Sequence, residues 1–230
     1  MKCFLYAMAK EADPLLSDAK ILSKRQAGFA SFYECKLEGK RFIVGVTGMG
    51  KVFAGSGVAS ALHLFPSIDA ILNIGVGGSL DAKKAPLLSV VIGERYAQHD
   101  MDTSAIGDPV GFISGIDKIY FDSDKELMKA VEAATSSLNI PTCRGTMTSG
   151  DTFYDDTANR RRIQKQYGSL SVDMESAAMA QIAFTHHVPF VALRVISDTG
   201  ETPNEYARYV LPASALAKQI AIEYLKNLED

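Results

Sequence analysis

Acidic side chains recur just after apolar segments of this 230-residue chain. Carboxylates in a cleft can act as general acids or bases, or can bind the hydroxyl groups of a sugar. If the apolar segments are strands of one sheet, several of these acids converge on one cleft. The acids in question are Glu11, Asp151, Asp173, Glu175 and Asp198.

Taken singly, each acid also has a structural explanation. Glu11 suits a helix surface, Asp151 suits a turn, and Asp198 suits the end of a strand. Glu175 could complement a helix dipole, and Asp173 is favoured as the N-cap of the helix that follows it. These explanations do not account for the recurrence of acids at strand ends.

Apolar runs rich in β-branched residues alternate with amphipathic helical patterns. This alternation predicts one α/β domain spanning residues 1–230, with a parallel or mixed central sheet, and ligands in such folds bind beyond the carboxyl ends of strands. Glycines and a proline predict a functional loop over 97–124. Strands are expected at 3–8, 41–50, 70–78, 88–100, 144–151, 170–174 and 189–198, and helices at 51–65, 125–138, 175–187 and 204–228, with Pro212 marking a kink or a break.

The composition excludes several classes of protein. The net charge of −3 comes without a basic stripe, and Arg160–Arg162 is interpreted as a solvated helix face, so no nucleic-acid partner is expected. No apolar run is long enough to span a membrane. The three cysteines have no metal-ligand spacing and suggest small buried side chains in a reducing compartment, which predicts a cytoplasmic protein.

Cofactor motifs are missing from the glycine-rich segments. Segments 47–55 and 73–78 lack the G-x-G-x-x-G pattern of dinucleotide sites and the lysine pattern of nucleotide phosphate loops. The histidines have no metal-ligand spacing, and no G-x-S-x-G elbow is present. We therefore expect neither a cofactor nor a metal ion.

Three motifs carry a family resemblance. The segments "AMAKE", "SGDTF" and "VDMESAAMAQIAFTHHVPFVALRVISD" resemble the nucleoside phosphorylase/nucleosidase superfamily, in particular the bacterial 5′-methylthioadenosine/S-adenosylhomocysteine nucleosidases. The resemblance runs in order from residue 1 to about residue 200. It implies a three-layer α/β/α sandwich around a twisted mixed sheet, a small purine nucleoside as substrate, and a homodimer.

The resemblance also implies catalytic roles. Asp198 would donate a proton to N7 of adenine, which requires a raised pKa in a water-poor cleft. Glu11 would be the general base that activates water, and Glu175 would bind the ribose hydroxyls. The implied reaction is hydrolysis of the N-glycosidic bond, releasing adenine and the thioribose.

The remaining site residues follow from the same resemblance. Met174 would pack on the sugar, Arg194 would hold Glu175 or the water, and Ser197 would orient Asp198. The other residues implied in substrate binding are Gly77, Thr152, Phe153 and Tyr154 around the sugar and adenine, Met8 and Met49 along the 5′ substituent, Tyr206 as the closing aromatic, and Ile106 reaching the partner's 5′ pocket.

Two positions at which this chain differs from the related phosphorylases predict the nucleophile. Related phosphorylases hold phosphate with an arginine and a serine where this chain has Asn73 and Val76, which favours water as the nucleophile. The nucleosidases themselves usually keep that serine, so Val76 alters how the water is held. A purine nucleoside phosphorylase, a futalosine hydrolase and a non-catalytic nucleoside-binding protein remain the alternatives.

Overall fold

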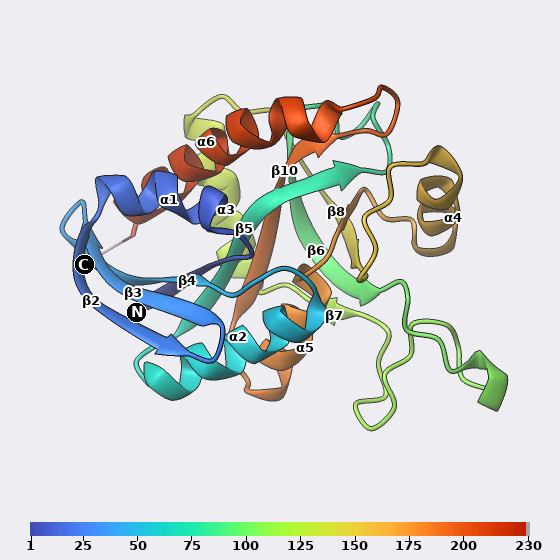
Figure 1. Cartoon of the computed structure of the whole chain (residues 1–230), viewed down its shortest axis with the longest axis horizontal. Helices are drawn as coiled ribbons and strands as arrows, with labels where there is room; N and C mark the ends of the chain where they lie inside the picture. Colours follow the sequence, from blue (N-terminus) through green and yellow to red (C-terminus); the bar gives the residue numbers. More distant parts are fainter. Residues whose placement is uncertain (229–230) are drawn as a thin grey trace.

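A ten-stranded mixed sheet forms the centre of the molecule (Figure 1). The computed structural model describes residues 1–228. The strands are β1 Lys2–Tyr6, β2 Lys20–Ala27, β3 Ala30–Leu37, β4 Lys40–Val46, β5 Ala70–Ser79, β6 Val90–Gln98, β7 Phe121–Asp122, β8 Thr142–Ser149, β9 Ser171–Asp173 and β10 Phe190–Asp198.

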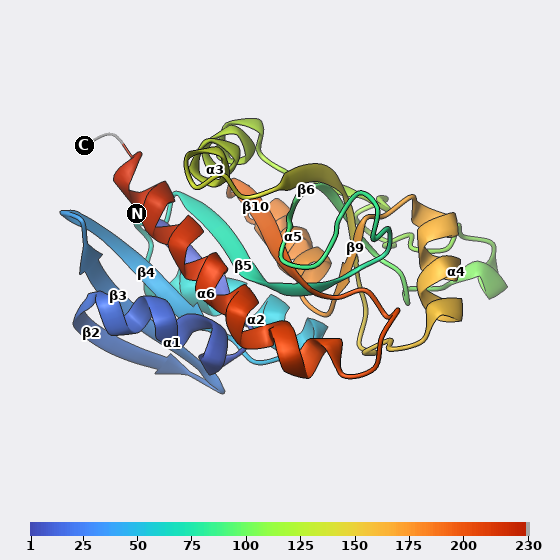
Figure 2. The same ribbon diagram turned by 90° about the horizontal axis from the view of Figure 1, so that it is seen from above.

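Helices cover both faces of the sheet. Figure 1 shows α1 and α6 above the sheet and α2 and α5 below it, and Figure 2 shows α6 lying across the upper face. A short 3₁₀ helix, η1 (Ser104–Ile106), lies in the segment between β6 and β7. The helices are α1 Ala9–Asp18, α2 Lys51–Leu64, α3 Lys125–Ser137, α4 Thr157–Tyr167, α5 Ser176–Thr185 and α6 Glu205–Lys226.

Each face of the sheet carries a large apolar core, and a smaller third cluster packs α4 against the sheet. One core joins α1, α3 and α6 to the sheet through residues such as Leu15, Val131 and Ile220. The other joins α2 and α5 to the opposite face through Val58 and Met179. The predicted three-layer α/β/α sandwich around a mixed sheet is therefore confirmed.

Part of the sheet closes on itself. The strand order runs β10-β6-β8-β9-β5-β1-β4-β3-β2, and β10 also pairs with β5, so five strands complete a ring. Strand β9 runs antiparallel to β5 and pairs with its last two residues, Gly78 with Val172 and Ser79 with Ser171. The chain after β9 is therefore directed back along β5, towards Val76.

Several elements differ from those expected from sequence. The hairpin β2–β3 and the helices α1 and α4 were not predicted. Helix α6 continues through Pro212, so a break there is wrong. Pro212 lies on the exposed side of the helix, where water can satisfy the carbonyl group that loses its N–H partner. Among the helices of residues 1–228, none has the length and apolar character needed to cross a membrane.

Candidate active site

Glu11 is fixed at the start of α1 by two backbone N–H groups. Its Oε2 accepts a hydrogen bond from Met8 at 3.0 Å, and its Oε1 accepts one from Val76 at 3.0 Å. Glu11 is the third residue of α1, so the first contact closes a capping box at the helix start. Burial raises the pKa of this carboxyl, and the Val76 N–H and the charge of Arg194 offset part of the rise.

Gly75 leaves the room that Glu11 occupies. A Cβ atom at Gly75 would lie 2.8 Å from Oε1 of Glu11 and 3.5 Å from Nη1 of Arg194. Strand β5 is buried along its whole length. A carboxylate can lie against its backbone only at a residue that has no side chain. The glycine therefore places a buried carboxylate beside the backbone N–H of Val76.

Two carboxylates follow β9 and behave differently. Asp173 accepts hydrogen bonds from the backbone N–H groups of Glu175 and Ser176, both at 2.9 Å, at the start of α5. The predicted structural role of Asp173 matches these contacts, although the N-cap position itself is Glu175. Glu175 accepts a hydrogen bond from the N–H of Gly50 at 3.0 Å. Burial and the charge of Asp173 raise the pKa of Glu175 to about 7.

Arg194 is a buried cation beneath these acids. Its Nε lies 3.1 Å from Asp173, and its Nη2 lies 3.8 Å from Glu175. Its Nη2 also donates to Oδ1 of Asn73 at 2.6 Å. The predicted contact between Arg194 and Glu175 is present, and Arg194 also holds Asp173.

Asn73 is used for structure rather than for ligand binding. Its amide donates to the carbonyl of Leu5 at 2.9 Å, and its Oδ1 accepts from Arg194 and from the hydroxyl of Ser176. The side chain is 1% exposed. It therefore ties β1, β10 and α5 together and fixes the orientation of Arg194.

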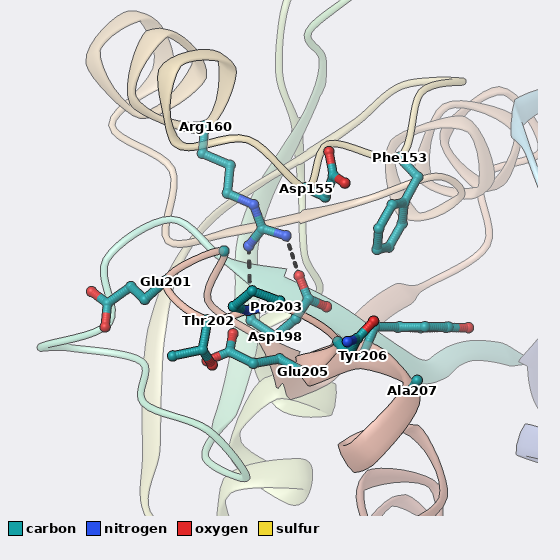
Figure 3. Close-up of a pocket in the computed structure, with 12 residues that line it drawn as sticks. Phe153, Asp155, Arg160, Asp198, Glu201, Thr202, Pro203, Glu205, Tyr206 and Ala207 are labelled. Carbon is teal, nitrogen blue, oxygen red and sulfur yellow. Dashed lines mark hydrogen bonds and ion pairs between the residues drawn. The ribbon is translucent and has the colours of Figure 1, made fainter.

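Asp198, at the end of β10, is paired with a cation from another element. Its Oδ2 accepts from the hydroxyl of Ser197 at 2.8 Å, as the predicted orienting role requires. Its Oδ1 forms a buried ion pair with Arg160 of α4 (Figure 3). Asp198 is 4% exposed, so it lies in a water-poor place as predicted, and the buried cation beside it was not predicted.

The interpretation of Arg160–Arg162 as a solvated face is wrong for Arg160. Arg161 and Arg162 are exposed, but Arg160 is buried. The inward face of α4 is made of Arg160, Ile163 and Tyr167. Their spacing of three and four residues is a helical pattern that could have identified Arg160 as an inward-facing residue.

The acids and their neighbours line a narrow cavity of about 70 Å³. It opens beside a larger cavity of about 500 Å³ between Phe153, Arg160 and the segment 200–207, and the two share Phe153, Asp198 and Tyr206. The rings of Phe153 and Tyr206 are in edge contact, with centroids 5.4 Å apart. The residues of the narrow cavity are Met8, Glu11, Met49, Val76, Gly77, Gly78, Phe153, Val172, Asp173, Met174, Glu175, Ser197, Asp198 and Tyr206.

Most of the predicted site residues therefore meet at one place. Thr152 and Tyr154 line a small adjoining cavity that also contains Phe153 and Asp198. Asp151 lies outside and accepts a hydrogen bond from the backbone N–H of Lys51 at 2.8 Å, at the start of α2. Ile106 is 81% exposed and lines none of these three cavities.

The site is built for proton transfer and hydrogen bonding. Among residues 1–228, no group of three or more histidine, cysteine, aspartate or glutamate side chains is arranged to hold a metal ion. The narrow cavity is lined by four buried carboxylates, each with fixed hydrogen-bond donors. Such an arrangement suits a ligand with hydroxyl groups and a bond broken by acid–base catalysis.

Comparison with known proteins agrees with this geometry. The family model of the phosphorylase superfamily matches residues 3–226, so the chain belongs to that superfamily. Within it, the chain is 30% identical to a 5′-methylthioadenosine/S-adenosylhomocysteine nucleosidase of Anoxybacillus flavithermus, over 95% of each chain. A nucleosidase of the same description from Staphylococcus haemolyticus is 29% identical, over 96% of this chain and 97% of the relative. The resemblance predicted from the sequence is confirmed.

Solved structures share the whole architecture. The nucleosidase of Neisseria meningitidis, in complex with methylthio-immucillin-A, superposes with a TM-score of 0.92 at 29% identity and covers 99% of both chains. A futalosine hydrolase of Helicobacter pylori has the same TM-score at 24% identity, over 99% of this chain and 97% of the other. The second likeness shows the fold alone.

Proposed function

We propose that this chain hydrolyses the N-glycosidic bond of 5′-methylthioadenosine, S-adenosylhomocysteine or both. The observation that carries the proposal is the meeting of Glu11, Glu175 and Asp198 at the wall of one cavity. The nucleosidases to which the chain is similar support this choice of substrates. The products are adenine and the corresponding thioribose.

The kinds of side chain that line the cavity suggest how the substrate lies. The ring of Phe153, beside Asp198, offers a surface on which a purine ring can stack. Glu175 and Met174 suit the ribose. Met8, Met49 and Tyr206 line the same cavity, with the hydroxyl of Tyr206 3.8 Å from the sulfur of Met8. Soft methionine side chains suit a thioether group at the 5′ position.

Glu11 is the proposed base for the attacking water. The water oxygen forms a bond to C1′ of the ribose, and Glu11 accepts the proton that the water loses. The electron pair of the C1′–N9 bond goes to the departing purine, which takes a proton at N7 from Asp198 and leaves as neutral adenine. Burial raises the pKa of Glu11, which makes its carboxylate a stronger base.

Charge favours water over phosphate as the nucleophile. Arg194 is a buried cation beside Glu11, and its charge faces Asp173, Glu175 and Glu11. One cation among three carboxylates leaves little attraction for a phosphate dianion. The side chain of Val76 adds no donor, although its backbone N–H orients Glu11.

One incubation tests the reaction. Purified protein is mixed with 5′-methylthioadenosine, S-adenosylhomocysteine, futalosine or inosine, each with and without phosphate, and the sugar product is identified. We expect free 5-methylthioribose or S-ribosylhomocysteine at the same rate in both conditions. A sugar 1-phosphate that appears only with phosphate would show phosphorolysis. Turnover of futalosine alone would show that the protein is a futalosine hydrolase.

Glu11→Gln tests the base. The amide keeps the size of the side chain but cannot accept a proton, so kcat should fall about 10²- to 10⁴-fold while substrate binding changes little. Glu126→Gln, on the exposed face of α3, is the matched control. A fully active Glu11→Gln enzyme would show that another group activates the water.

We also propose that the chain acts as a cytoplasmic homodimer. Exposed apolar side chains gather near the site on α2 and the β2–β3 turn, where the rings of Phe29 and Phe53 lie 4.8 Å apart and Val52 is 80% exposed. Ile106, on the loop after β6, is equally exposed and would reach the partner's 5′ pocket. The three free cysteines are compatible with a reducing compartment.

A further inference from the structure

The carboxylate of Glu175 meets the residue that precedes α2. Oε1 of Glu175 accepts the N–H of Gly50 at 3.0 Å. Gly50 is the N-cap of α2, and its φ of +92° is a conformation that other residues rarely adopt. The N–H of an N-cap residue has no partner within its own helix, so this one can donate to Glu175. The direction of the donor therefore depends on how the start of α2 is held in place.

Three side chains hold the start of α2. Oδ1 of Asp151, which follows β8, accepts the backbone N–H of Lys51 at 2.8 Å. Nζ of Lys51 donates to Oδ1 of Asp100, which follows β6, at 2.6 Å. Oδ2 of Asp100 accepts the backbone N–H of Asp151 at 2.9 Å, which closes a ring of hydrogen bonds. We call Lys51, Asp100 and Asp151 the Lys51 clamp.

The Lys51 clamp lies against Gly50. A Cβ atom at Gly50 would lie 3.0 Å from Oδ1 of Asp151, so this oxygen occupies the place beside the glycine. The side chains of Lys51 and Asp100 are 17% and 28% exposed, so their ion pair is partly shielded from water and salt. Asp151 is more exposed, but its backbone N–H is fixed by Asp100. The clamp therefore limits the movement of the glycine.

A further link joins the Lys51 clamp to α5. Nζ of Lys51 donates to Oε1 of Gln98 at 3.0 Å, and Nε2 of Gln98 donates to Oε1 of Gln181 at 2.6 Å. Gln181 belongs to α5, and Glu175 is the N-cap of that helix. The donor Gly50 and the acceptor Glu175 are therefore fixed relative to each other by one network.

We propose that Asp151, through the Lys51 clamp, is a positioning residue for Glu175: it directs the N–H of Gly50 at the carboxylate that binds the ribose hydroxyls. The inference rests on the proposed function, because it takes Glu175 as the ribose-binding group. Asp151 lines none of the three cavities at the site, so it acts through Gly50 rather than by contact with the substrate.

The Gly50 donor matters because charges surround Glu175. Burial and the charges of Asp173 and Glu11 favour the protonated form of Glu175, whereas the charge of Arg194 and the N–H of Gly50 favour the ionised form. Displacement of Gly50 would remove one of these two stabilising contacts and raise the pKa of Glu175. A protonated carboxyl group accepts fewer hydrogen bonds from ribose hydroxyls than a carboxylate does.

Titration of Glu175 tests the contact without turnover. Carbon-13 NMR of protein with labelled glutamate follows the carboxyl of Glu175, identified by comparison with Glu175→Gln, in wild type, Asp151→Ala and Asp151→Asn. The asparagine keeps an oxygen that can accept the N–H of Lys51, and both variants lose the charge of Asp151. We expect the pKa of Glu175 in Asp151→Ala to lie about 0.5–1 pH unit above that in Asp151→Asn, the size of one hydrogen bond. Equal values in the two variants would overturn the proposal.

Asp124→Ala is the matched control for a lost helix cap. Asp124 accepts the N–H groups of Glu126 and Leu127 at the start of α3, at 3.0 and 2.9 Å, and it lines none of the three cavities at the site. The pKa of Glu175 should keep its wild-type value in this variant. A shift as large as that in Asp151→Ala would show general loosening of the fold and would also overturn the proposal.

A double-mutant cycle tests the consequence for catalysis. Asp151→Ala should lower kcat/KM for methylthioadenosine about tenfold in the wild-type background. In the Glu175→Ala background the same change should have little effect, because the N–H of Gly50 then has no carboxylate to meet. A loss of equal size in both backgrounds would show that Asp151 acts only on the fold, which contradicts a positioning role.

Asp100→Ala keeps the proposal testable if Asp151→Ala does not fold. This variant removes the contacts of Asp100 with Lys51 and with the N–H of Asp151. It also removes a negative charge, which by itself would lower the pKa of Glu175. A higher pKa of Glu175 would support the proposal, and an unchanged or lower one would overturn it. Because the titration needs no substrate, absence of hydrolysis in wild type would refute the proposed function and leave this test standing.

Discussion

The position of one carboxylate depends on the absence of one side chain. Glu11 can accept the N–H of Val76 only because Gly75 has no Cβ. Strand β10 pairs with β5 through Gly75, and β1 pairs with β5 up to Asn73, so the backbone cannot easily move aside. A methyl group at position 75 must therefore displace the carboxylate.

Gly75→Ala should cut kcat by about 10²-fold or more, because a displaced general base loses its alignment with the water. The fold should persist, since a single methyl group in a core costs about 1–3 kcal/mol. Steady-state kinetics and thermal melting measure the two effects. Gly55→Ala, where the nearest atom is 3.4 Å away, is the control and should be fully active. Normal turnover in Gly75→Ala would argue against Glu11 as the base.

Glu175 and Asp173 share Arg194 unequally. Asp173 has the shorter contact with Arg194 and two backbone donors, and these lower its pKa despite burial. Glu175 is left with one backbone donor and a longer contact. Burial and the nearby charge of Asp173 therefore disfavour the charged form of Glu175. Such an environment suits ligand binding more than it suits stability.

Glu175→Gln should lose activity and gain stability at alkaline pH. A folded-state pKa of about 7, raised from 4.5, stabilises the fold below pH 4.5 and loses that contribution as the pH rises through 7. The amide has no charge to bury, so the variant should be about 1–3 kcal/mol more stable than wild type at pH 8 and similar at pH 4.5. Urea unfolding at the two pH values measures this difference.

Loss of the proposed ribose contact should lower kcat/KM of the same variant about 10- to 100-fold. Glu126→Gln is again the control and should change neither quantity. Equal stability of Glu175→Gln and wild type at pH 8 would show that Glu175 is not a source of destabilisation in the folded protein.

At the scale of elements, one buried histidine lies at the end of β6. His99 is 3% exposed, and neither of its ring nitrogens has a hydrogen-bond partner within residues 1–228. Its ring lies 5.6 Å from that of Tyr154. Burial lowers the pKa of His99, partly offset by the charge of Asp100. The folded protein therefore favours the neutral form of this imidazole.

His99→Leu should make the fold less sensitive to acid. A depressed histidine pKa contributes stability that is present above the unfolded value of 6.5 and is lost as the pH falls through the folded value. Urea unfolding between pH 5 and pH 7.5 should show a smaller loss on acidification in the variant than in wild type. His63→Leu, on the exposed side of α2, should keep the wild-type slope. Parallel curves for His99→Leu and wild type would contradict the prediction.

Elements with a buried apolar pattern were predictable from sequence, and exposed ones were not. Strand β5 is buried throughout and β10 likewise, and both were expected within a residue of their observed limits. Strand β2 is exposed along most of its length, so it has no apolar alternation to reveal it. The closure of the ring by β10 and β5 depends on pairing between distant segments, which no local pattern encodes.

The site was predictable where acids follow strands and where the family motifs lie. Glu11, Glu175 and Asp198 were expected to converge, and they line one cavity. Arg160 was missed because its neighbours Arg161 and Arg162 are solvent-exposed, and three adjacent arginines resemble a charged surface. The pairing of Arg160 with Asp198 joins residues 38 positions apart, so it becomes visible only in the folded chain.

At the scale of the whole molecule, the proposed dimer can be tested at Ile106. Ile106→Asp places a charge in the proposed interface, so the variant should sediment as a monomer at concentrations where wild type is a dimer. Its kcat/KM for methylthioadenosine should fall, because each 5′ pocket loses the partner's contribution. Leu211→Asp, at an exposed apolar position on α6, is the control and should leave the assembly unchanged. A wild-type protein that is monomeric and fully active would contradict the proposed dimer.

Because part of the sheet closes into a ring, the sheet has few unpaired edge strands. Five strands pair on both sides within the ring, so β2 and the two-residue β7 form the outer edges among residues 1–228. Strand β2 carries Lys20, Lys24 and Arg25 along its exposed length. Positive charges on an edge strand oppose the docking of a strand from another molecule. Lys20, Lys24 and Arg25, none of which lines the proposed active site, therefore oppose edge-to-edge association at β2.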